Sequence, residues 1–262
     1  MKKNLKLLAL TGLLSLVVSA NSLGSTLKVG ATPVPHSEIL EIVKPELAKE
    51  GIELEIVEFT DYVTPNIALN DGDLDANFFQ HSPYLKKFAE ERNLDIASAG
   101  AIHVEPLGLF SSKHKSLDEL EKGSVVAIPN DPANGGRALI LLHNNGIIKL
   151  SNPQNLYSTE FDVVENPKKI KFKSLEAAQL PRVLRDVDFA IINGNYAIEA
   201  NLNPSKDALL LEGKESPYAN VIAVKTKDLN KEEVKSLVKA LQSEKVADFI
   251  KEKYNGAVVK AF

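Results

Sequence analysis

Strand-like and helix-like segments alternate along this chain, and this order constrains its fold more than any other feature. Residues 27–31 read as a strand, residues 38–50 as a helix that Gly51 ends, and residues 52–57 as a strand with period-two alternation. A short helix at 63–69 then precedes an aromatic strand. A β-α-β-α-β order of this kind favours a largely parallel sheet with helices on its faces.

A second unit of the same kind follows residues 98–110, where we place a crossover between lobes. Its expected elements are a strand at 124–128, a helix at 133–144, a strand at 162–165, a helix at 174–185 and a strand at 189–193. A strand at 221–225 then returns to the first lobe, where an amphipathic helix opening at Asn230 packs.

These elements predict an α/β fold of two lobes, each a mixed, mostly parallel sheet with flanking helices. A chain of 262 residues is long enough to divide into two cores. The predicted limits are residues 26–108 with 222–262 for the first lobe and residues 109–221 for the second.

Residues 1–20 have the pattern of a secretory signal peptide. Three lysines precede an uncharged apolar run at 7–18 that is short for a membrane span. We expect cleavage after Ala20, with cleavage after Ser25 as the alternative. No later segment has the roughly 18 uninterrupted apolar residues of a membrane helix, so we expect a soluble mature protein outside the cytoplasm.

Charge and composition disfavour several classes of function. Losing three lysines with residues 1–20 changes the formal net charge from −4 to −7, and no basic patch of the kind that binds nucleic acid is evident. The chain has no cysteine, which excludes disulfides, thiolate metal sites and cysteine nucleophiles. Its five histidines never stand at i,i+4 spacing, so we expect neither a metal site nor a cofactor.

Residues 75–85 bring three aromatic rings and an imidazole together in one short segment. We expect a strand to end near His81, because a Ser-Pro pair that follows it is suited to open a helix. Alternation then places Phe79 and His81 on one face, with Tyr84 one turn later. Such a platform suits a ligand with an apolar tail and a polar head. The alternative is that these rings are ordinary core residues.

A second candidate site lies at the start of the helix at 133–144. Asp131 and Pro132 are helix-start signals, and Arg137 in the following turn offers a planar fork for a carboxylate. Gly135 and Gly136 would let a ligand approach closely. The alternative is a solvated surface arginine next to glycines that only ease the start of the helix.

Amide side chains gather at two other loop tips. Asn193 and Asn195 follow the strand at 189–193, and Asn220 precedes the returning strand. A carboxamide can accept from an ammonium group and donate to a carboxylate, which suits a zwitterion. Asparagine is also common in turns, which is the alternative explanation.

Six ordered blocks relate the chain to a known family: residues 29–40, 75–85, 103–108, 130–139, 192–197 and 216–220. With these blocks, the chain from about residue 27 to residue 262 resembles the NlpA family of substrate-binding proteins, the MetQ-like methionine-binding receptors of ABC importers. The resemblance implies a two-lobed periplasmic-binding-protein fold of type II-like topology. It implies a binding function and no reaction.

The resemblance also implies roles for single residues. The wall around a thioether side chain would consist of Tyr62, Phe79, His81 and Tyr84. Arg137 would pair with the ligand carboxylate. The amino and carboxyl groups would be held by Asn134, by Asn193 or Asn195, and by Asn220. The choice between Asn193 and Asn195 stays open.

The implied partners are L-methionine and an ABC permease with its ATPase, and we expect a monomer. D-methionine, methionine sulfoxide and a methionine-containing dipeptide stay open as ligands. Because the chain has no cysteine, we expect a periplasmic protein without a lipid anchor. The competing class is an enzyme on the same fold, a hydrolase or dehydratase that uses His81 with an acid from the other lobe.

Overall fold

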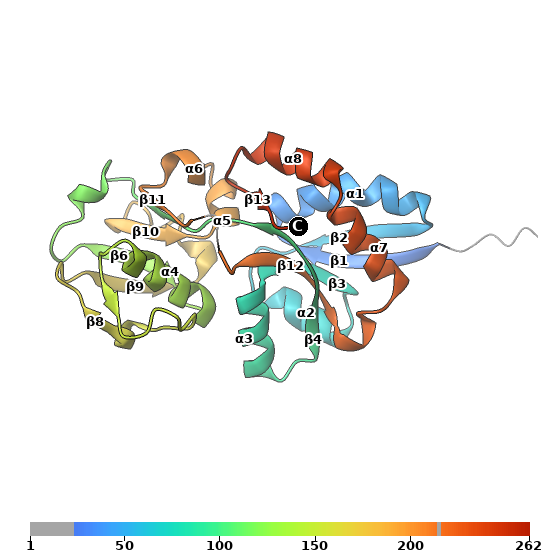
Figure 1. Ribbon diagram of the computed structural model, residues 1–262, viewed down its shortest axis with the longest axis horizontal. Helices are drawn as coiled ribbons and strands as arrows, with labels where there is room; N and C mark the ends of the chain where they lie inside the picture. The colour runs from blue at the N-terminus through green and yellow to red at the C-terminus, as the bar shows by residue number, and fades with distance from the viewer. Residues whose placement is uncertain (1–23, 214–215) are drawn as a thin grey trace, which may run out of the picture.

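The computed structural model describes residues 24–213 and 216–262, which form two α/β lobes side by side (Figure 1). The predicted signal peptide, residues 1–20, lies outside the described residues. The strand order is β13-β4-β12-β3-β1-β2 in the first lobe and β11-β5-β10-β6-β9 in the second. The expectation of an α/β fold with two lobes is therefore confirmed. Within the described ranges, each helix is too short or too polar to cross a membrane.

The sheet of the first lobe contains strands from both ends of the chain. They are β1 (Ser25–Ala31), β2 (Ile52–Glu58), β3 (Ala76–His81), β4 (Ile96–Val104), β12 (Ala219–Lys225) and β13 (Val259–Lys260). β1 pairs in parallel with β2 and β3, whereas β12 runs antiparallel between β3 and β4. The sheet is therefore mixed, and its antiparallel half comes from the chain's return to this lobe.

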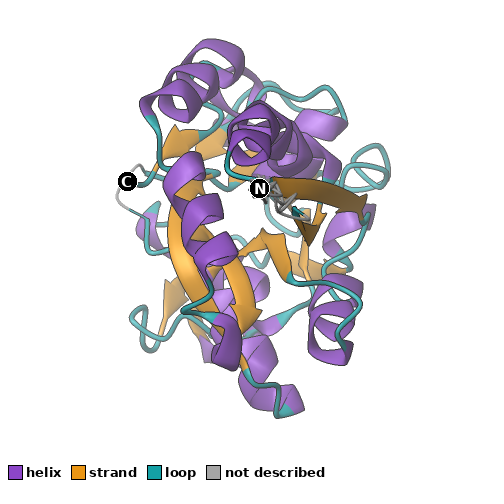
Figure 2. Ribbon diagram, turned by 90° about the vertical axis from the view of Figure 1, so that its right-hand side faces the viewer, coloured by secondary structure: helices purple, strands orange, loops and turns teal. Residues whose placement is uncertain are grey.

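Helices cover both faces of this sheet (Figure 2). One face carries α1 (Glu38–Lys49), α7 (Glu232–Leu241) and α8 (Glu244–Tyr254), and the other carries α2 (Thr64–Asp71) and α3 (Ser82–Arg92). Residues of β12 alternate between the two cores: Ile222 and Val224 pack with the first group, Val221 and Ala223 with the second. The predicted packing of a C-terminal helix on this lobe is confirmed.

The second sheet contains β5 (Gly108–Phe110), β6 (Val125–Pro129), β9 (Lys171–Leu175), β10 (Phe189–Ile192) and β11 (Leu210–Leu211). Its β6 pairs in parallel with β9 and β10, and β5 pairs antiparallel with β10 and β11. α4 (Pro132–Asn144) covers one face, and α5 (Gly194–Glu199) packs on the other. The remaining helix of this part of the chain is α6 (Pro204–Asp207).

Shorter elements complete the described chain. β7 (Lys149–Leu150) and β8 (Val163–Glu165) form a small sheet of their own. The short helical turns are η1 (Pro33–Ser37), η2 (Leu117–Glu119), η3 (Glu160–Asp162), η4 (Ala177–Gln179) and η5 (Thr226–Asp228).

The prediction of a helix at 174–185 is wrong. This region contains the end of β9, the single turn η4 and further turns. Ala177, Leu180 and Leu184 have helical spacing and do pack into one core, which explains the misleading pattern. Pro181 has no backbone N–H and so cannot donate the hydrogen bond that a continuous helix needs at this position, although Leu180 before it has helical φ and ψ. The strand beside β6 is therefore β9, and the predicted strand at 162–165 pairs outside the main sheet.

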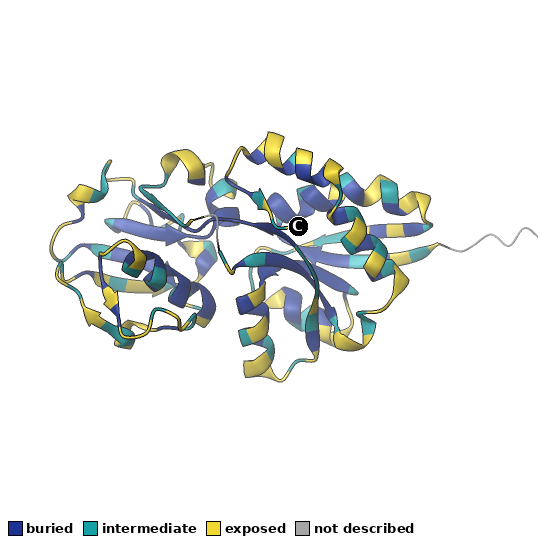
Figure 3. Ribbon diagram, viewed as in Figure 1, coloured by how far each residue is buried: buried dark blue, intermediate teal, exposed yellow. Residues whose placement is uncertain are grey.

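Two segments connect the lobes. The chain leaves the first sheet after β4 and enters the second at β5, and it returns between β11 and β12. Figure 3 shows that the strands of both lobes are mostly buried, whereas the outer helix faces are exposed. The predicted lobe limits fall at Gly108, the first residue of β5, and inside β12. The exact division stays a prediction.

Gly136 allows two parts of the second lobe's backbone to touch. A Cβ at this position would lie 2.3 Å from the carbonyl oxygen of Leu156 and 2.9 Å from the backbone nitrogen of Ser158. Gly135 similarly faces the carbonyl oxygen of Pro129, at 3.0 Å. The glycine pair thus serves packing within the lobe, and the expectation that it lets a ligand approach is not supported.

We expect Gly136→Ala to destabilise the protein by about 1–3 kcal/mol, because neither backbone neighbour of the new methyl group is free to move. In a protein of this size, each kcal/mol corresponds to roughly 2–4 °C in the unfolding temperature. Thermal unfolding followed by circular dichroism measures the change. Gly213→Ala is the control, because a Cβ there meets nothing within 4 Å. Equal unfolding temperatures for the two variants would contradict the prediction.

Candidate functional site

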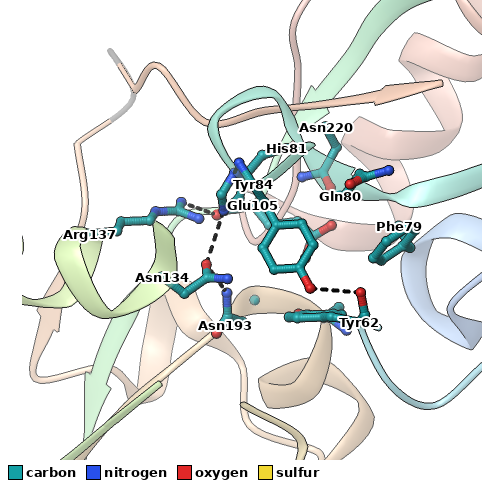
Figure 4. A pocket seen from close by; sticks show the side chains of 12 residues that line it. Tyr62, Phe79, Gln80, His81, Tyr84, Glu105, Asn134, Arg137, Asn193 and Asn220 are labelled. Atoms are coloured by element: carbon teal, nitrogen blue, oxygen red, sulfur yellow. Dashed lines mark hydrogen bonds between the residues drawn. The ribbon is translucent and has the colours of Figure 1, made fainter. Parts of the chain in front are cut away.

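A cavity lies between the lobes, where strands of both sheets end and helices begin (Figure 4). In this structure the free space inside the cavity is about 20 Å³, which is room for about one water molecule. The lining residues are Tyr62, Phe79, Gln80, His81, Tyr84, Glu105, Asn134, Arg137, Asn193, Gly194, Asn195 and Asn220. All nine residues predicted for the site are among them, and both Asn193 and Asn195 reach the cavity.

Sequence reasoning missed Gln80, Glu105 and Gly194. Each of them lies inside one of the six blocks that carry the family resemblance, so a signal was present. What sequence could not supply was the side chains that surround them, which come from distant parts of the chain.

A β-bulge shapes the end of β3. Phe78 lies opposite one residue of β12 and Gln80 lies opposite the next, so Phe79 is the extra residue of the bulge. The regular alternation predicted for Phe79 and His81 is therefore interrupted. Both residues still line the cavity, and His81 is the last residue of the strand.

Aromatic rings of the first lobe form one wall of the cavity. The ring centroid of Tyr62 lies 5.9 Å from that of Phe79 and 5.8 Å from that of Tyr84, as in packed aromatic pairs. The Tyr84 hydroxyl donates to the carbonyl oxygen of Tyr62 at 2.7 Å. His81 caps α3, since its Nδ1 accepts the backbone N–H of Tyr84 at 3.1 Å, and its Nε2 therefore carries the hydrogen.

Asn134 stands opposite, in the first turn of α4. Its Nδ2 donates to both carboxylate oxygens of Asp131, at 3.1 and 3.0 Å, which directs its Oδ1 toward the cleft. That oxygen lies 3.0 Å from His81 Nε2 and accepts Asn193 Nδ2 at 2.7 Å. The predicted start of α4 at Asp131 and Pro132 is confirmed, and it positions this amide.

Further hydrogen bonds cross between the lobes. The Tyr62 hydroxyl donates to Asn195 Oδ1 at 2.5 Å, and the Tyr196 hydroxyl donates to the carbonyl oxygen of Thr60 at 3.1 Å. The lobes are therefore closed in this structure. Two buried amide atoms beside these bonds, Asn193 Oδ1 and Asn195 Nδ2, have no hydrogen-bond partner among the residues described.

Arg137 is buried, with 3% of its surface exposed, so the alternative of a solvated surface arginine is wrong. Its Nε donates to Glu212 Oε1 at 2.9 Å, and its Nη2 donates to Glu212 Oε2 and to the carbonyl oxygen of Glu105, the latter at 2.8 Å. The guanidinium also stacks over Tyr218, 4.3 Å from the ring centroid. Arg137 thus has a carboxylate partner from its own chain.

Glu105 lies at the centre of a buried hydrogen-bonded chain. Its Oε1 lies 2.7 Å from His103 Nε2 and 3.3 Å from His36 Nε2. His36 Nε2 also lies 3.2 Å from Asn220 Oδ1, and its Nδ1 lies 2.7 Å from the Thr32 hydroxyl. The Asn220 amide, predicted from sequence as a ligand contact, is therefore held by an imidazole.

Burial has opposite effects on these groups. It lowers the pKa of His36 to about 4 and that of His81 to about 3, so both imidazoles are neutral near pH 7. Burial raises the pKa of Glu105, but this is outweighed by its neighbours, first the His36 imidazole and then the hydrogen bond with His103. The pKa of Glu105 lies below its usual value, and its carboxylate is ionised.

His36, His103 and Glu105 also form a group that could hold a metal ion, since one ligand atom of each lies within 4.8 Å of the others. The histidine spacing in sequence had suggested no metal site, because these residues meet only in the folded protein. In this structure these side chains form hydrogen bonds with each other and with Asn220. The group contributes a negative carboxylate to one side of the cavity.

Stability should fall as the pH is lowered from 7 to 5. The pKa values of His36 and His81 lie below the 6.5 of an unfolded chain, so the unfolded state binds protons first and gains stability. Each histidine contributes up to about 1.4 kcal/mol per pH unit. Urea unfolding of protein refolded without small molecules measures this slope. His81→Asn should reduce it by about half, and an unchanged slope would contradict the assignment.

Comparison with known proteins relates nearly the whole described chain to one family. Residues 27–262 match the NlpA lipoprotein family. The D-methionine-binding lipoprotein MetQ of Escherichia coli K12 is 44% identical, with 90% of this chain and 88% of that protein covered. Outer membrane lipoprotein 3 of Mannheimia haemolytica is 42% identical over 99% of this chain and 100% of its own. A nutrient binding protein of Burkholderia cenocepacia, whose structure holds methionine, is 50% identical with a TM-score of 0.87, covering 90% and 100% of the two chains.

These relatives overturn the expectation of a protein without a lipid anchor. The E. coli and M. haemolytica proteins are named lipoproteins. The expectation depended on one missing residue type, since the sequence has no cysteine. Similarity over 90% or more of the chain is the stronger evidence, and the expectation is withdrawn.

Proposed function

This chain belongs to the NlpA lipoprotein family, and we propose that it is the substrate-binding protein of an ABC importer with methionine as its ligand. The main observation in support of this proposal is the closed cavity between the lobes, which has an aromatic wall on one side and amide and charged groups on the other. The relatives are named as binding proteins, so the alternative of a hydrolase or dehydratase is dropped.

The aromatic wall is suited to the methionine side chain. Tyr62, Phe79 and Tyr84 enclose one end of the cavity with their rings at packing distance. A thioether is apolar and polarisable, and its sulfur packs favourably against aromatic rings. We therefore place the side chain of the ligand against these three rings and against His81.

The polar wall is suited to the zwitterionic head. Asn193 Oδ1 can accept from an ammonium group and Asn195 Nδ2 can donate to a carboxylate, and neither atom has a partner among the described residues. Arg137 uses its Nε and Nη2 within the protein, which leaves Nη1 for the ligand carboxylate. Asn134 and Asn220 complete this wall, so both open alternatives, Asn193 and Asn195, are proposed as contacts.

We propose that the protein acts as a monomer that passes its ligand to an ABC permease with its ATPase. We keep residues 26–108 with 222–262 and residues 109–221 as the two bodies that move in closure.

Isothermal titration calorimetry against L-methionine, D-methionine, methionine sulfoxide, glycyl-methionine and leucine tests the proposal. Tight binding of a methionine enantiomer, with leucine much weaker, is the expected result. Tighter binding of glycyl-methionine would overturn the assignment of a free amino acid as the ligand, but it would not affect the assignment of the family. Mass spectrometry of each mixture over time should find the ligand unchanged.

Loss of a head-group contact should cost more than loss of a side-chain contact. Removing one partner of a buried charged pair costs about 2–5 kcal/mol, whereas trimming an apolar pocket costs about 1–3 kcal/mol. We therefore expect Arg137→Gln to weaken methionine affinity more than Phe79→Leu does. Both variants are first checked for native thermal unfolding, since Arg137 also pairs with Glu212. The reverse order of affinities would contradict the proposed orientation.

Closure should depend on the ligand. The closed form is held by hydrogen bonds such as Tyr62 to Asn195 and His81 to Asn134, and a ligand that contacts both lobes favours it further. Small-angle scattering should give a smaller radius of gyration for saturated protein than for protein refolded without ligand. Identical profiles for the two samples would argue against a hinge.

A further inference from the structure

Glu105 is an ionised carboxylate that faces the cavity from a segment connecting the lobes. Only 5% of its surface is exposed. Its Oε1 lies 2.7 Å from His103 Nε2 and 3.3 Å from His36 Nε2, and Gly194, at the start of α5 in the second lobe, packs against its side chain. The carboxylate is thereby held in place at the cavity wall, where it has hydrogen-bond donors but needs a countercharge.

The nearest fixed cation is already matched. Arg137 directs two of its donor atoms to the Glu212 carboxylate and meets Glu105 only at the backbone carbonyl oxygen. Glu212 and Glu105 together place two negative charges around one guanidinium. The cavity side of Glu105 therefore lacks an equal positive charge among the described residues.

The His36 imidazole does not supply that charge. His36 bonds through both ring nitrogens, to Thr32 and to Asn220, and burial keeps it neutral. His103 directs its Nε2 to the carboxylate, and its Nδ1 is buried without a partner among the described residues.

The atoms beside Glu105 are suited to a cationic donor. Gly194 packs directly on it: a Cβ at Gly194 would lie 2.7 Å from Glu105 Cβ and 3.3 Å from its Oε2. The contact brings the start of α5, and with it Asn193, next to the carboxylate. Asn193 Oδ1 is a second buried acceptor there without a partner in the described chain. An ammonium group has three donors and satisfies such acceptors.

We propose that Glu105 is the countercharge for the α-ammonium group of the ligand and makes the site selective for ligands with a free α-amine. This assignment rests on the proposed function, and it names the chemical class that the site admits. N-acylated methionine lacks the charge and adds bulk, and the α-hydroxy analogue of methionine lacks only the charge.

A divalent cation is the other occupant that His36, His103 and Glu105 could take. The geometry favours the ammonium group. Metal binding would break the 2.7 Å contact between His103 Nε2 and Glu105. A metal-bound histidine also normally donates its other ring N–H to an acceptor, and His103 Nδ1 has none among the described residues.

Calorimetry with methionine and with its α-hydroxy analogue, 2-hydroxy-4-(methylthio)butanoate, tests the assignment. The wild-type protein should prefer methionine strongly. Glu105→Gln should weaken methionine binding by about 30-fold or more and change binding of the hydroxy analogue by no more than about threefold, because only methionine loses a charged partner. Glu176→Gln is the matched control, since it removes a carboxylate near the cleft mouth but outside this cavity.

Each other result overturns the assignment. Equal losses for both ligands would indicate a structural role, and unchanged methionine binding by Glu105→Gln would exclude the countercharge. If Glu105→Gln does not fold, the comparison is made with the wild-type protein alone. Equal affinity of the wild-type protein for methionine and the hydroxy analogue would overturn the selectivity for a free α-amine, whereas the proposed binding of methionine would be unaffected. Stoichiometric Zn²⁺ binding by EDTA-treated protein, lost in Glu105→Gln, would assign the group to a metal. Failure to bind any methionine compound would instead refute the proposed function.

Discussion

The pairing of buried polar groups across the cleft is the constraint on which the rest of this structure depends. Asn134 Oδ1 is bonded from the first lobe by His81 and from its own lobe by Asn193, so separating the lobes exposes an acceptor that must then find water. The main apolar cores of the two lobes are separate clusters, and a smaller aromatic cluster joins Phe79, Tyr84 and Phe88 to Ala133 of α4 across the cleft. Closure therefore buries a small apolar area and exchanges polar contacts with water for polar contacts with protein, and the net free energy of that polar exchange is small. A ligand can shift such a balance with few contacts.

The connecting segments are part of the binding wall, which joins recognition to hinge geometry. Arg137 reaches both segments: it donates to the carbonyl oxygen of Glu105 on one, and it pairs with Glu212 and stacks on Tyr218 on the other. The backbone N–H of Leu107 also lies 3.4 Å from Glu212 Oε2. A change in hinge angle thus moves the groups that hold the guanidinium. The affinity of a ligand that binds Arg137 should therefore depend on the hinge angle.

Local signals predicted local structure here, and long-range contacts decided the rest. Asp131 and Pro132 predicted the start of α4 because a cap and a proline act within one turn. The apolar spacing around Pro181 predicted a helix that the chain does not form, since core packing accepts the same side chains from turns. The family resemblance predicted nine lining residues, eight of them inside the six blocks, yet the role of Glu105 depends on His36, about seventy residues away, and on which strands pair.

The polar groups that lack partners within the protein indicate what the ligand contributes. Arg137 and Glu212 satisfy each other within the protein, and the resemblance that assigns Arg137 to the ligand carboxylate does not reveal this pair. Among the cavity-lining residues, Asn193 Oδ1 and Asn195 Nδ2 have no hydrogen-bond partner in the described chain, and the Glu105 carboxylate has no matching fixed cation on its cavity side. An unsatisfied buried group costs more than a satisfied one contributes. Most of the free energy that a ligand adds to closure should therefore come from these acceptors and donors of the connecting segment and α5.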